Sequence, residues 1–322
     1  MNAPSALAVR VTRKTAEAEG ISTFELASAD DTPLPSFSAG SHVDVQVPGG
    51  LTRQYSLCND PAESHRYLIG VLRDAASRGG SAAMHEQVHE GTLLQISPPK
   101  NHFALAHHAP RHLLLAGGIG VTPILCMAER LAATGADFEM HYATRSRART
   151  AFFERIQRAP FAARVHFHFD DGAPAQKLDI GALLAAQPAS THLYVCGPQG
   201  LMEAALGAAR ASGWDEQRLH YEFFSADVQP RAGDGAFEVQ LASSGRVIFV
   251  PAERSVLAAL ADAGVIVPSS CEQGVCGTCL TRVIDGVPDH RDQYLLPDEQ
   301  AANDQFLPCC SRAKSARLVL DL

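Results

Sequence analysis

Residues 1–107 alternate apolar and polar positions in short runs. The clearest runs are ISTFELAS at 21–28, HVDVQVP at 42–48, RYLIGVL at 66–72 and LLQIS at 93–97. Gly, Pro and Asp separate the runs, as turns between strands require. A period of two places alternate side chains in a core, so this block is predicted to form a small antiparallel β-barrel. Within it, SRGGSAAMHEQV at 77–88 has the composition of a helix.

Residues 108–226 follow a different pattern, in which strand-like runs alternate with helix-like ones. The strand candidates are LLLAGG at 113–118, FEMHYATR at 138–145, VHFHFDD at 165–171, HLYVCG at 192–197 and LHYEFF at 219–224. The helix candidates are TPILCMAERLAATG at 122–135, AFFERIQRA at 151–159 and GLMEAALGAARASG at 200–213. This alternation predicts a parallel sheet with right-handed crossover helices.

Residues 227–235 hold polar residues, Pro and Gly without periodicity and are predicted to be a linker. Residues 236–322 form the third block. Its candidates are a hairpin, FEVQLASSGRVIFV at 237–250, a short helix, SVLAALADAG at 255–264, and a closing strand, RLVLDL at 317–322. Ser255 is placed to cap the helix and Gly264 to end it.

Composition narrows the classes of protein to consider. The chain has 322 residues, of which 46% are hydrophobic and 19% charged, enough apolar material for several cores. Its net charge of −8 argues against a nucleic-acid partner, which usually requires a basic face. The N-terminus lacks the apolar core of a signal peptide, and no run of about 18 apolar residues predicts a membrane span. We therefore expect a cytoplasmic protein and, by default, a monomer.

Clustered cysteines carry the strongest chemical signal. Five of the eight cysteines follow residue 270. Cys271, Cys276 and Cys279 have the spacing C-x4-C-x2-C, and Cys309 follows at a distance. This is the plant-type spacing for a [2Fe–2S] cluster, in which four thiolates complete the coordination of two irons.

The loop that carries three of these ligands has to wrap tightly around a cluster. Gly274 and Gly277 permit positive φ angles and let backbone N–H groups approach the sulfurs. A zinc site is the alternative, although zinc usually takes two C-x2-4-C pairs and only one such pair is present. Cys309 and Cys310 are neighbours that point to opposite sides of an extended segment, so one of them can face the cluster; we predict Cys309.

Two segments of the barrel block suggest a flavin site. Arg53 can pair with a phosphate, Tyr55 lies on the same face of a strand, and Ser56 offers a hydroxyl or N–H to a flavin ring. About 25 residues later in the chain, Arg78-Gly79-Gly80-Ser81 opens the helical segment and can form an anion cradle at a helix N-terminus. An ordinary barrel strand and an ordinary loop with a helix cap are the alternative interpretations.

Three segments of the second block suggest a nucleotide site. Residues 116–123, AGGIGVTP, join a strand to a helix and lack the full G-x-G-x-x-G pattern. Thr144 and Arg145 end the next strand, and the segment from Cys196 to Pro198 ends a later one. Ligands of parallel sheets bind at the carboxyl ends of strands, so the three segments together favour a nicotinamide site.

The motifs R-x-Y-S-L, R-G-G-S, G-G-I-G-V-T-P, C-G-P and C-x4-C-x2-C, followed by C-C-S-R-A, occur in this order over nearly the whole chain. The sequence thus resembles the phthalate dioxygenase reductase family. The resemblance implies a multidomain α/β and β protein. Its parts would be an FMN-binding barrel of the ferredoxin-reductase type at 1–107, an NAD-binding α/β domain at 108–226, a linker at 227–235 and a β-grasp, plant-type [2Fe–2S] ferredoxin domain at 236–322.

The resemblance also implies site residues. The FMN contacts would be Arg53, Gln54, Tyr55, Ser56, Val71, Arg78, Gly79, Gly80 and Ser81. The nicotinamide nucleotide contacts would be Gly118, Gly120, Thr122, Pro123, Thr144, Arg145, Cys196, Gly197 and Pro198. Ser56, Thr122 and Phe224 would lie near the site of hydride transfer, with Phe224 covering the flavin and yielding to the nicotinamide. The cluster ligands would be Cys271, Cys276, Cys279 and Cys309.

The resemblance implies FMN rather than FAD and NADH as the electron donor. Arg145, Arg147 and Arg149 could instead bind the 2′-phosphate of NADPH, or form a solvated basic loop. FMN would convert a two-electron hydride into single electrons for the cluster, so that no side-chain acid or base is required. The expected acceptor is a terminal Rieske-type oxygenase, either a ring dioxygenase or an O-demethylase.

Two other functions fit the same motifs. One is a reductase for a cytochrome P450 or another monooxygenase. The other is a redox-sensing, ferredoxin-like carrier without nicotinamide turnover. The aromatic substrate of an oxygenase partner cannot be derived from this chain, because the chain does not contact that substrate.

Overall fold

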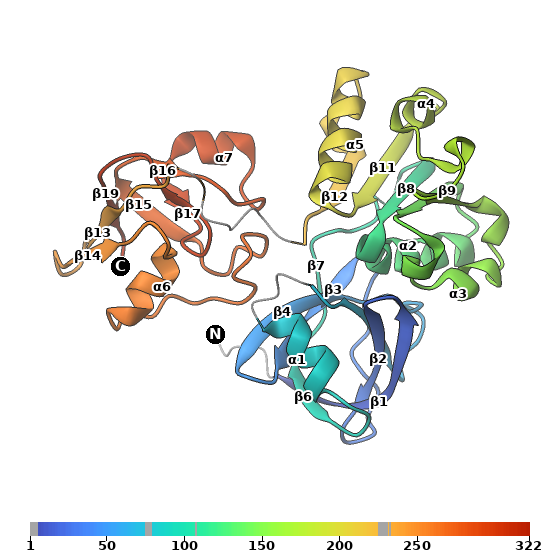
Figure 1. The fold of residues 1–322 in the computed structure, drawn as a ribbon, viewed down its shortest axis with the longest axis horizontal. Coiled ribbons are helices and arrows are strands. Elements are labelled where there is room, and N and C mark those ends of the chain that lie inside the picture. Colours follow the sequence, from blue (N-terminus) through green and yellow to red (C-terminus); the bar gives the residue numbers. More distant parts are fainter. Residues whose placement is uncertain (1–5, 75–78, 107, 225–230, 232) are drawn as a thin grey trace. The chain divides into compact units, whose positions relative to one another are not determined.

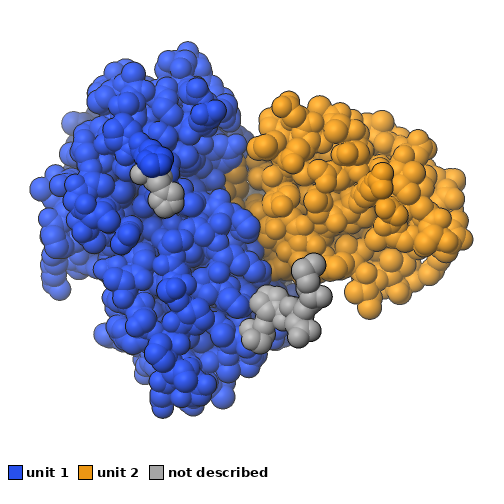
Figure 2. Space-filling model, turned by 180° about the vertical axis from the view of Figure 1, so that it is seen from behind, with its two compact units in different colours: residues 1–222 blue, residues 223–322 orange. Residues whose placement is uncertain are grey.

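A computed structural model describes residues 6–74, 79–106, 108–224, 231 and 233–322. The chain forms two compact units, residues 1–222 and residues 223–322, which Figure 2 shows in different colours. The first unit contains a β-barrel and a parallel α/β sheet, and the second contains a mixed sheet with two short helices (Figure 1).

The barrel of the first unit is built from seven strands and one helix. The strands are β1 (Leu7–Ala18), β2 (Ile21–Ser28), β3 (Ser41–Val47), β4 (Leu51–Ser56), β5 (Tyr67–Leu72), β6 (Leu93–Ile96) and β7 (Lys100–Asn101), and the helix is α1 (Gly80–Gln87). They pair in the order β4-β3-β6-β1-β2-β5, with β7 beside β3. A bridge between Leu57, directly after β4, and Ile69 of β5 joins the two ends, so the sheet closes.

The α/β part of the first unit has a five-stranded parallel sheet in the order β10-β9-β8-β11-β12. The strands are β8 (Arg111–Gly117), β9 (Phe138–Thr144), β10 (Val165–Phe169), β11 (Thr191–Cys196) and β12 (Leu219–Glu222). The helices are α2 (Val121–Ala133), α3 (Phe153–Gln157), α4 (Ile180–Ala185) and α5 (Gln199–Ala211), with short 3-10 turns η1 (Gly118–Gly120), η2 (Arg147–Arg149), η3 (Ala162–Arg164), η4 (Pro174–Gln176) and η5 (Glu216–Arg218). Alternate residues of β8 face opposite sides, so that α2 packs with Leu114 and Ala116 while α5 approaches Gly117.

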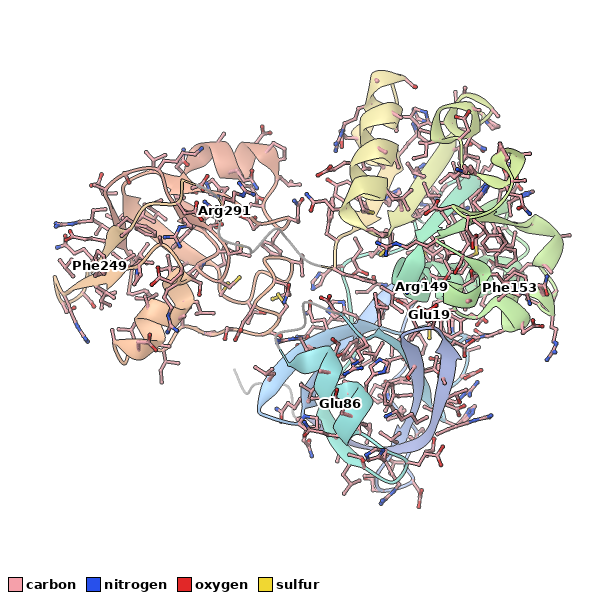
Figure 3. All side chains as sticks on the ribbon, in the orientation of Figure 1. Glu19, Glu86, Arg149, Phe153, Phe249 and Arg291 are labelled. Atoms are coloured by element: carbon pink, nitrogen blue, oxygen red, sulfur yellow. The ribbon has the colours of Figure 1, made fainter. Side chains whose placement is uncertain are left out.

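Contacts between the ends of elements join the barrel to the α/β part of the first unit. The Glu19 carboxylate, beside the end of β1, pairs with Arg149 of η2 (Figure 3). The backbone N–H of Phe152 donates to the Glu17 carboxylate over 2.9 Å. The Gly70 Cα of β5 lies so close to Thr122 of α2 that a Cβ on residue 70 would meet the threonine methyl at 2.9 Å. The two parts thus pack as one unit.

The second unit carries a sheet in the order β14-β13-β19-β15-β17 and a separate pair, β16-β18. Its elements are β13 (Phe237–Leu241), β14 (Val247–Val250), α6 (Val256–Asp262), β15 (Thr281–Asp285), β16 (Pro288–Asp289), α7 (Pro297–Ala302), β17 (Gln305–Phe306), β18 (Arg312–Ala313) and β19 (Arg317–Leu320). Ser255 caps α6 as predicted, because its hydroxyl accepts from the N–H of Ala258. The core includes Val239, Leu260, Phe306 and Leu318.

The pattern of the sequence predicted most of these elements. The structure confirms strands in all four runs of the barrel block, the parallel alternation after residue 108, and the hairpin, helix and closing strand of the third block. It adds two helices and six strands that the pattern did not predict, namely α4, α7, β1, β7, β15, β16, β17 and β18. Helices α4 and α7 span only six residues each, too few for a helical period to stand out. Among the described residues, none of the helices is both long and apolar enough to cross a membrane.

A buried arginine ties the segment before β13 to the rest of the second unit. Arg291, labelled in Figure 3, has 6% of its side chain exposed, and Asp234 has 9%. The guanidinium donates to both oxygens of Asp234, over 2.5 and 2.9 Å, and also contacts Asp289. The ion pair is bidentate and shielded from water, so its loss should cost much folding free energy.

We predict that Asp234→Ala lowers the free energy of unfolding of the second unit by about 3 kcal/mol, because it leaves a buried guanidinium with only one carboxylate. The matched control is Glu238→Ala, which breaks an exposed pair with Arg317 in the same unit and should change the free energy by less than about 1 kcal/mol. Chemical denaturation of the full chain measures both, and equal effects of the two substitutions would contradict the prediction.

Candidate functional site

Strand β4 places Arg53 against the start of helix α1, and we call this arrangement the phosphate cradle. Arg53 of β4 crosses the backbone of Gly80, since a Cβ on Gly80 would meet the Arg53 Nε at 2.6 Å. Gly79, which precedes α1, has a φ of 95°, a left-handed conformation that favours glycine. The fold therefore brings an arginine from one strand onto a helix N-terminus, as phosphate binding requires. Arg78, the other predicted phosphate contact, lies outside the described residues.

The remaining β4 residues divide into two groups. Tyr55 lies on the side of Arg53 and is largely buried, and this burial raises the pKa of its hydroxyl. Gln54 points the other way, where its amide donates to the Asp44 carboxylate over 2.9 Å. Val71 of β5 is fully buried, and Ser81 Oγ accepts from the N–H of Asp74. Arg53 and Tyr55 are thus on the same side, as predicted, whereas Gln54 is engaged within the barrel.

Ser56 meets a carboxyl group from the far end of the α/β sheet. Its hydroxyl donates to Glu222 Oε2 over 3.3 Å, and His42 Nδ1 lies 4.0 Å from Glu222 Oε1. Burial raises the pKa of Glu222 to about 7 and lowers the pKa of His42 to about 4. The histidine is therefore neutral near pH 7 and cannot neutralise the carboxylate, while the carboxyl group can hold a proton beside Ser56. Cys196, the register partner of Glu222, is a buried thiol with a raised pKa.

The glycine turn after β8 is shaped by close packing on one side and open space on the other. A Cβ on Gly120 would lie 2.3 Å from the carbonyl oxygen of Cys196, and one on Gly117 would lie 2.8 Å from Pro198. Gly118, with a φ of 50°, has open space where a side chain would be. This backbone is therefore accessible to a pyrophosphate. Thr122 is buried, and its hydroxyl donates to the carbonyl of Ile119.

The predicted ribose-side residues differ in their surroundings. The Thr144 hydroxyl lies 2.7 Å from that of Thr150 and orders the following turn. Arg147 pairs with Glu154 and stacks over the Phe153 ring, and Arg149 pairs with Glu19. Arg145 is exposed. Two of the three arginines that could bind a 2′-phosphate therefore already have carboxylate partners.

In the second unit, the cysteine thiols meet in two pairs. The Cys271 thiol contacts that of Cys276, and the Cys279 thiol contacts that of Cys309. Cys271, Cys279 and Cys309 are buried, and Cys276 is half-buried. The hydrogen bond from Cys271 lowers the pKa of Cys276. Two pairs of thiols match the need of a two-iron cluster for two protein sulfurs on each iron.

Backbone N–H groups of the loop surround these sulfurs. The N–H of Gln273 donates to Cys271 Sγ over 3.3 Å, and the N–H of Gly274 donates to Cys309. Gly274 and Gly277 have φ angles of 72° and 69°, as the sequence predicted. A Cβ on Gly277 would meet the Tyr294 ring at 2.2 Å. These donors fit thiolate ligands, whose charge they stabilise.

Cys310 has a different environment from Cys309. Its thiol points to the carbonyl of Leu307, 3.7 Å away, and to the Ser311 hydroxyl, 3.8 Å away. Cys309 and Cys310 lie in a turn, not in the extended segment that the sequence predicted, and their thiols contact each other. The Cys309 thiol also contacts that of Cys279, which belongs to the cysteine loop. The geometry thus favours Cys309 over its neighbour as the fourth ligand.

Glu222 is the residue at this site that sequence reasoning missed. It lies one position before Phe223, in a run whose aromatic residues alone suggest a role at the flavin. What marks Glu222 is the burial of its carboxyl group at the end of a strand, and burial cannot be read from a single sequence. Phe224 is exposed and belongs to the second unit, and its predicted role over the flavin stays a prediction.

Comparisons with known proteins agree with this geometry. A family described as "2Fe-2S iron-sulfur cluster binding domain" matches residues 239–314, and one described as "Dimethylamine monooxygenase subunit DmmA-like, N-terminal domain" matches residues 93–219. A vanillate O-demethylase oxidoreductase from Pseudomonas sp. (strain HR199 / DSM 7063) is 56% identical over 305 residues, 95% of this chain and 96% of the relative.

Two solved structures extend the comparison. A phthalate dioxygenase reductase, described as a modular structure for electron transfer from pyridine nucleotides to [2Fe–2S], is 41% identical, with a TM-score of 0.81 over 99% of this chain and 98% of that one. The chain belongs to the phthalate dioxygenase reductase family. An intact type IV self-sufficient cytochrome P450 monooxygenase is 39% identical, with a TM-score of 0.78, over 98% of this chain and 41% of that chain.

As a member of the phthalate dioxygenase reductase family, the chain is an NADH-dependent oxidoreductase and the reductase component of an oxygenase system. FMN and a [2Fe–2S] cluster are its cofactors. The cradle at Arg53, the open backbone at Gly118 and the two thiol pairs fit these groups. The family membership agrees with the resemblance predicted from the motifs.

We predict that Glu222 makes the first unit less stable as pH rises. The unfolded carboxyl ionises near 4.5, whereas the folded one keeps its proton up to about 7. Stability therefore falls between these values, by at most about 3 kcal/mol. Glu222→Gln removes this dependence. The free energy of unfolding of the variant minus that of wild type should therefore increase between pH 5 and pH 8. Parallel curves for the two proteins in chemical denaturation would refute the prediction.

Proposed function

We propose that the chain is the reductase of a vanillate O-demethylase-type system, which carries electrons from NADH to a terminal Rieske-type oxygenase acting on a methoxylated aromatic acid. The observation that carries the proposal is the pairing of Cys271 with Cys276 and of Cys279 with Cys309, in a chain 56% identical to a vanillate O-demethylase oxidoreductase. We further propose that it is a cytoplasmic monomer without a nucleic-acid or membrane partner.

The proposal divides the work among the predicted domains. Residues 1–107 hold FMN, residues 108–226 hold NADH, residues 227–235 link the domains, and residues 236–322 hold the cluster. When bound, FMN accepts a hydride and releases electrons singly to the cluster. The protein positions the cofactors, encloses them and supplies hydrogen bonds to them.

On the flavin side, Arg53, Gly79 and Gly80 bind the phosphate, and Tyr55 packs beside the ring. Ser56 directs its hydroxyl at the reactive edge, and the protonated Glu222 can exchange a proton with Ser56 Oγ over the 3.3 Å contact. Because burial raises its pKa to about 7, the carboxyl group carries less negative charge near pH 7 than an ordinary glutamate, and so opposes electron transfer toward the ring less.

On the nucleotide side, Gly118 and Gly120 admit the pyrophosphate to the start of α2, and Thr122 and Pro123 fix that turn. Thr144, Arg145 and the segment Cys196-Gly197-Pro198 border the same edge of the sheet. The ion pairs of Arg147 and Arg149 support NADH over NADPH, because binding a 2′-phosphate would compete with Glu154 and Glu19.

We predict that Cys309→Ser abolishes the cluster, whereas Cys310→Ser keeps it, because only Cys309 contacts the cysteine loop. Iron, acid-labile sulfide and visible absorbance of both purified proteins measure the outcome. Each variant replaces one buried sulfur with an oxygen at adjacent positions, so each controls for the other. Cluster loss in Cys310→Ser alone would reverse the assignment.

An electron-delivery assay tests the proposed partner. The purified chain with NADH should support O-demethylation of vanillate by the oxygenase component of a vanillate O-demethylase, and the Cys309→Ser variant should not. A second candidate acceptor is a cytochrome P450, since a self-sufficient monooxygenase of that type contains a homologous region. Reduction of a cytochrome P450 without turnover of any Rieske-type oxygenase would overturn the proposal in favour of that candidate.

A further inference from the structure

Two neighbouring strands of the parallel sheet carry a cluster that the electron-transfer function does not use. Glu139 and His141 lie two positions apart on β9, so they share one face of the sheet. His166 of β10 is the register partner of His141, and the two rings stack with centroids 4.8 Å apart. Three side chains with metal-binding atoms therefore project from one patch.

The binding atoms of this patch converge. Glu139 Oε1 lies 3.1 Å from His141 Nε2 and 3.2 Å from His166 Nε2. The three atoms all lie within 4.8 Å of one another, as one ion requires. Two imidazole nitrogens and one carboxylate oxygen are a ligand set typical of zinc and other divalent transition metals.

A hydrogen-bond chain fixes the tautomer of His141. Its Nδ1 lies 2.9 Å from His168 Nε2, and His168 Nδ1 lies 3.2 Å from the carbonyl of Gln176. A carbonyl only accepts, so His168 Nδ1 carries a hydrogen and, in the neutral ring, its Nε2 accepts. His141 Nδ1 must then be the donor. Histidines that ligate metals commonly donate their second N–H to such a partner.

This tautomer leaves an electron pair on His141 Nε2. The Nε2 atom is buried and, with Nδ1 as the donor, carries no hydrogen to donate. It faces Glu139 Oε1, which is also an acceptor. Two acceptors 3.1 Å apart repel each other, and a cation bound by both removes the repulsion.

The surroundings orient the carboxylate toward the histidines and leave a route for an ion. Arg111 Nη2 lies 3.1 Å from Glu139 Oε2, and the Gln187 amide donates to the same oxygen over 3.5 Å. These contacts hold Oε2 and leave Oε1 facing the two rings. The His166 side chain is 50% exposed, which opens the patch to solvent.

We propose that Glu139, His141 and His166 bind one divalent transition-metal ion of the zinc type, with water completing its coordination. Glu139 and His166 are the second residues of their strands, so the ion lies toward the amino ends of the sheet. Nucleotides bind at the opposite, carboxyl ends. The ion therefore fastens the edge strand β10 to β9 and takes no part in electron transfer.

Zinc binding by the chain with its cluster intact tests the proposal. The holoprotein, with its iron content verified, is titrated with Zn²⁺ against a zinc-sensitive chromophore. We expect one zinc per chain in wild type and affinity weaker by at least about tenfold in His166→Ala, which removes a half-exposed ligand without disturbing the core. Glu139→Gln should weaken zinc binding similarly, and zinc should raise the thermal midpoint of wild type but not of these two variants.

The matched control is His192→Ala. His192 and His220 form a similar stacked pair on other strands of the same sheet, with 2.9 Å between ring nitrogens. Among the described residues, these two histidines belong to no group of three side chains that could hold a metal ion. Zinc affinity should be unchanged in this variant. Wild type without a bound zinc, or equal zinc affinity in wild type, His166→Ala and Glu139→Gln, would overturn the proposal.

Discussion

The convergence of four thiols from two segments of the chain is the constraint on which the second unit is built. Cys271, Cys276 and Cys279 lie in one loop, and Cys309 follows 30 residues after the last of them. Strand β15 leaves the loop and pairs with β17, which leads back toward Cys309. A loop without regular structure could not hold thiolates at fixed positions, so the sheet serves as a frame for the cysteines.

Hydrogen bonds on buried polar groups brace the same corner. Ser311, two residues after Cys309, accepts from the N–H of Arg291 and donates to Asp292. The N–H of Gln293 donates to the carbonyl of Gly274 in the cysteine loop over 2.9 Å. The segment at 291–293 thus holds both ligand-bearing segments, and the pair of Arg291 with Asp234 fixes that segment in turn. Rigid ligands keep reorganisation small when a bound metal centre changes its charge.

How far the sequence predicted these features depends on whether the feature is local. Spacing along the chain was enough to predict that Cys271, Cys276, Cys279 and Cys309 lie together, because three of them share one loop. Strand and helix periods were enough for most elements, but helices of six residues escaped. The carboxyl group of Glu222 and the cluster around His141 could not be predicted, since each depends on partners that only strand order and register bring together. Burial, which raises the pKa of Glu222, is likewise a property of the fold.

The central claim is that electrons enter this chain as a hydride at the flavin and leave singly through the cluster. Rapid mixing of the anaerobic holoprotein with NADH, followed by absorbance and frozen-sample paramagnetic resonance, tests it most directly. The account predicts that flavin absorbance bleaches first and that the signal of a reduced [2Fe–2S] cluster follows within the same turnover. A cluster that stays oxidised while the flavin is fully reduced, or a flavin that NADH does not bleach, would contradict the account.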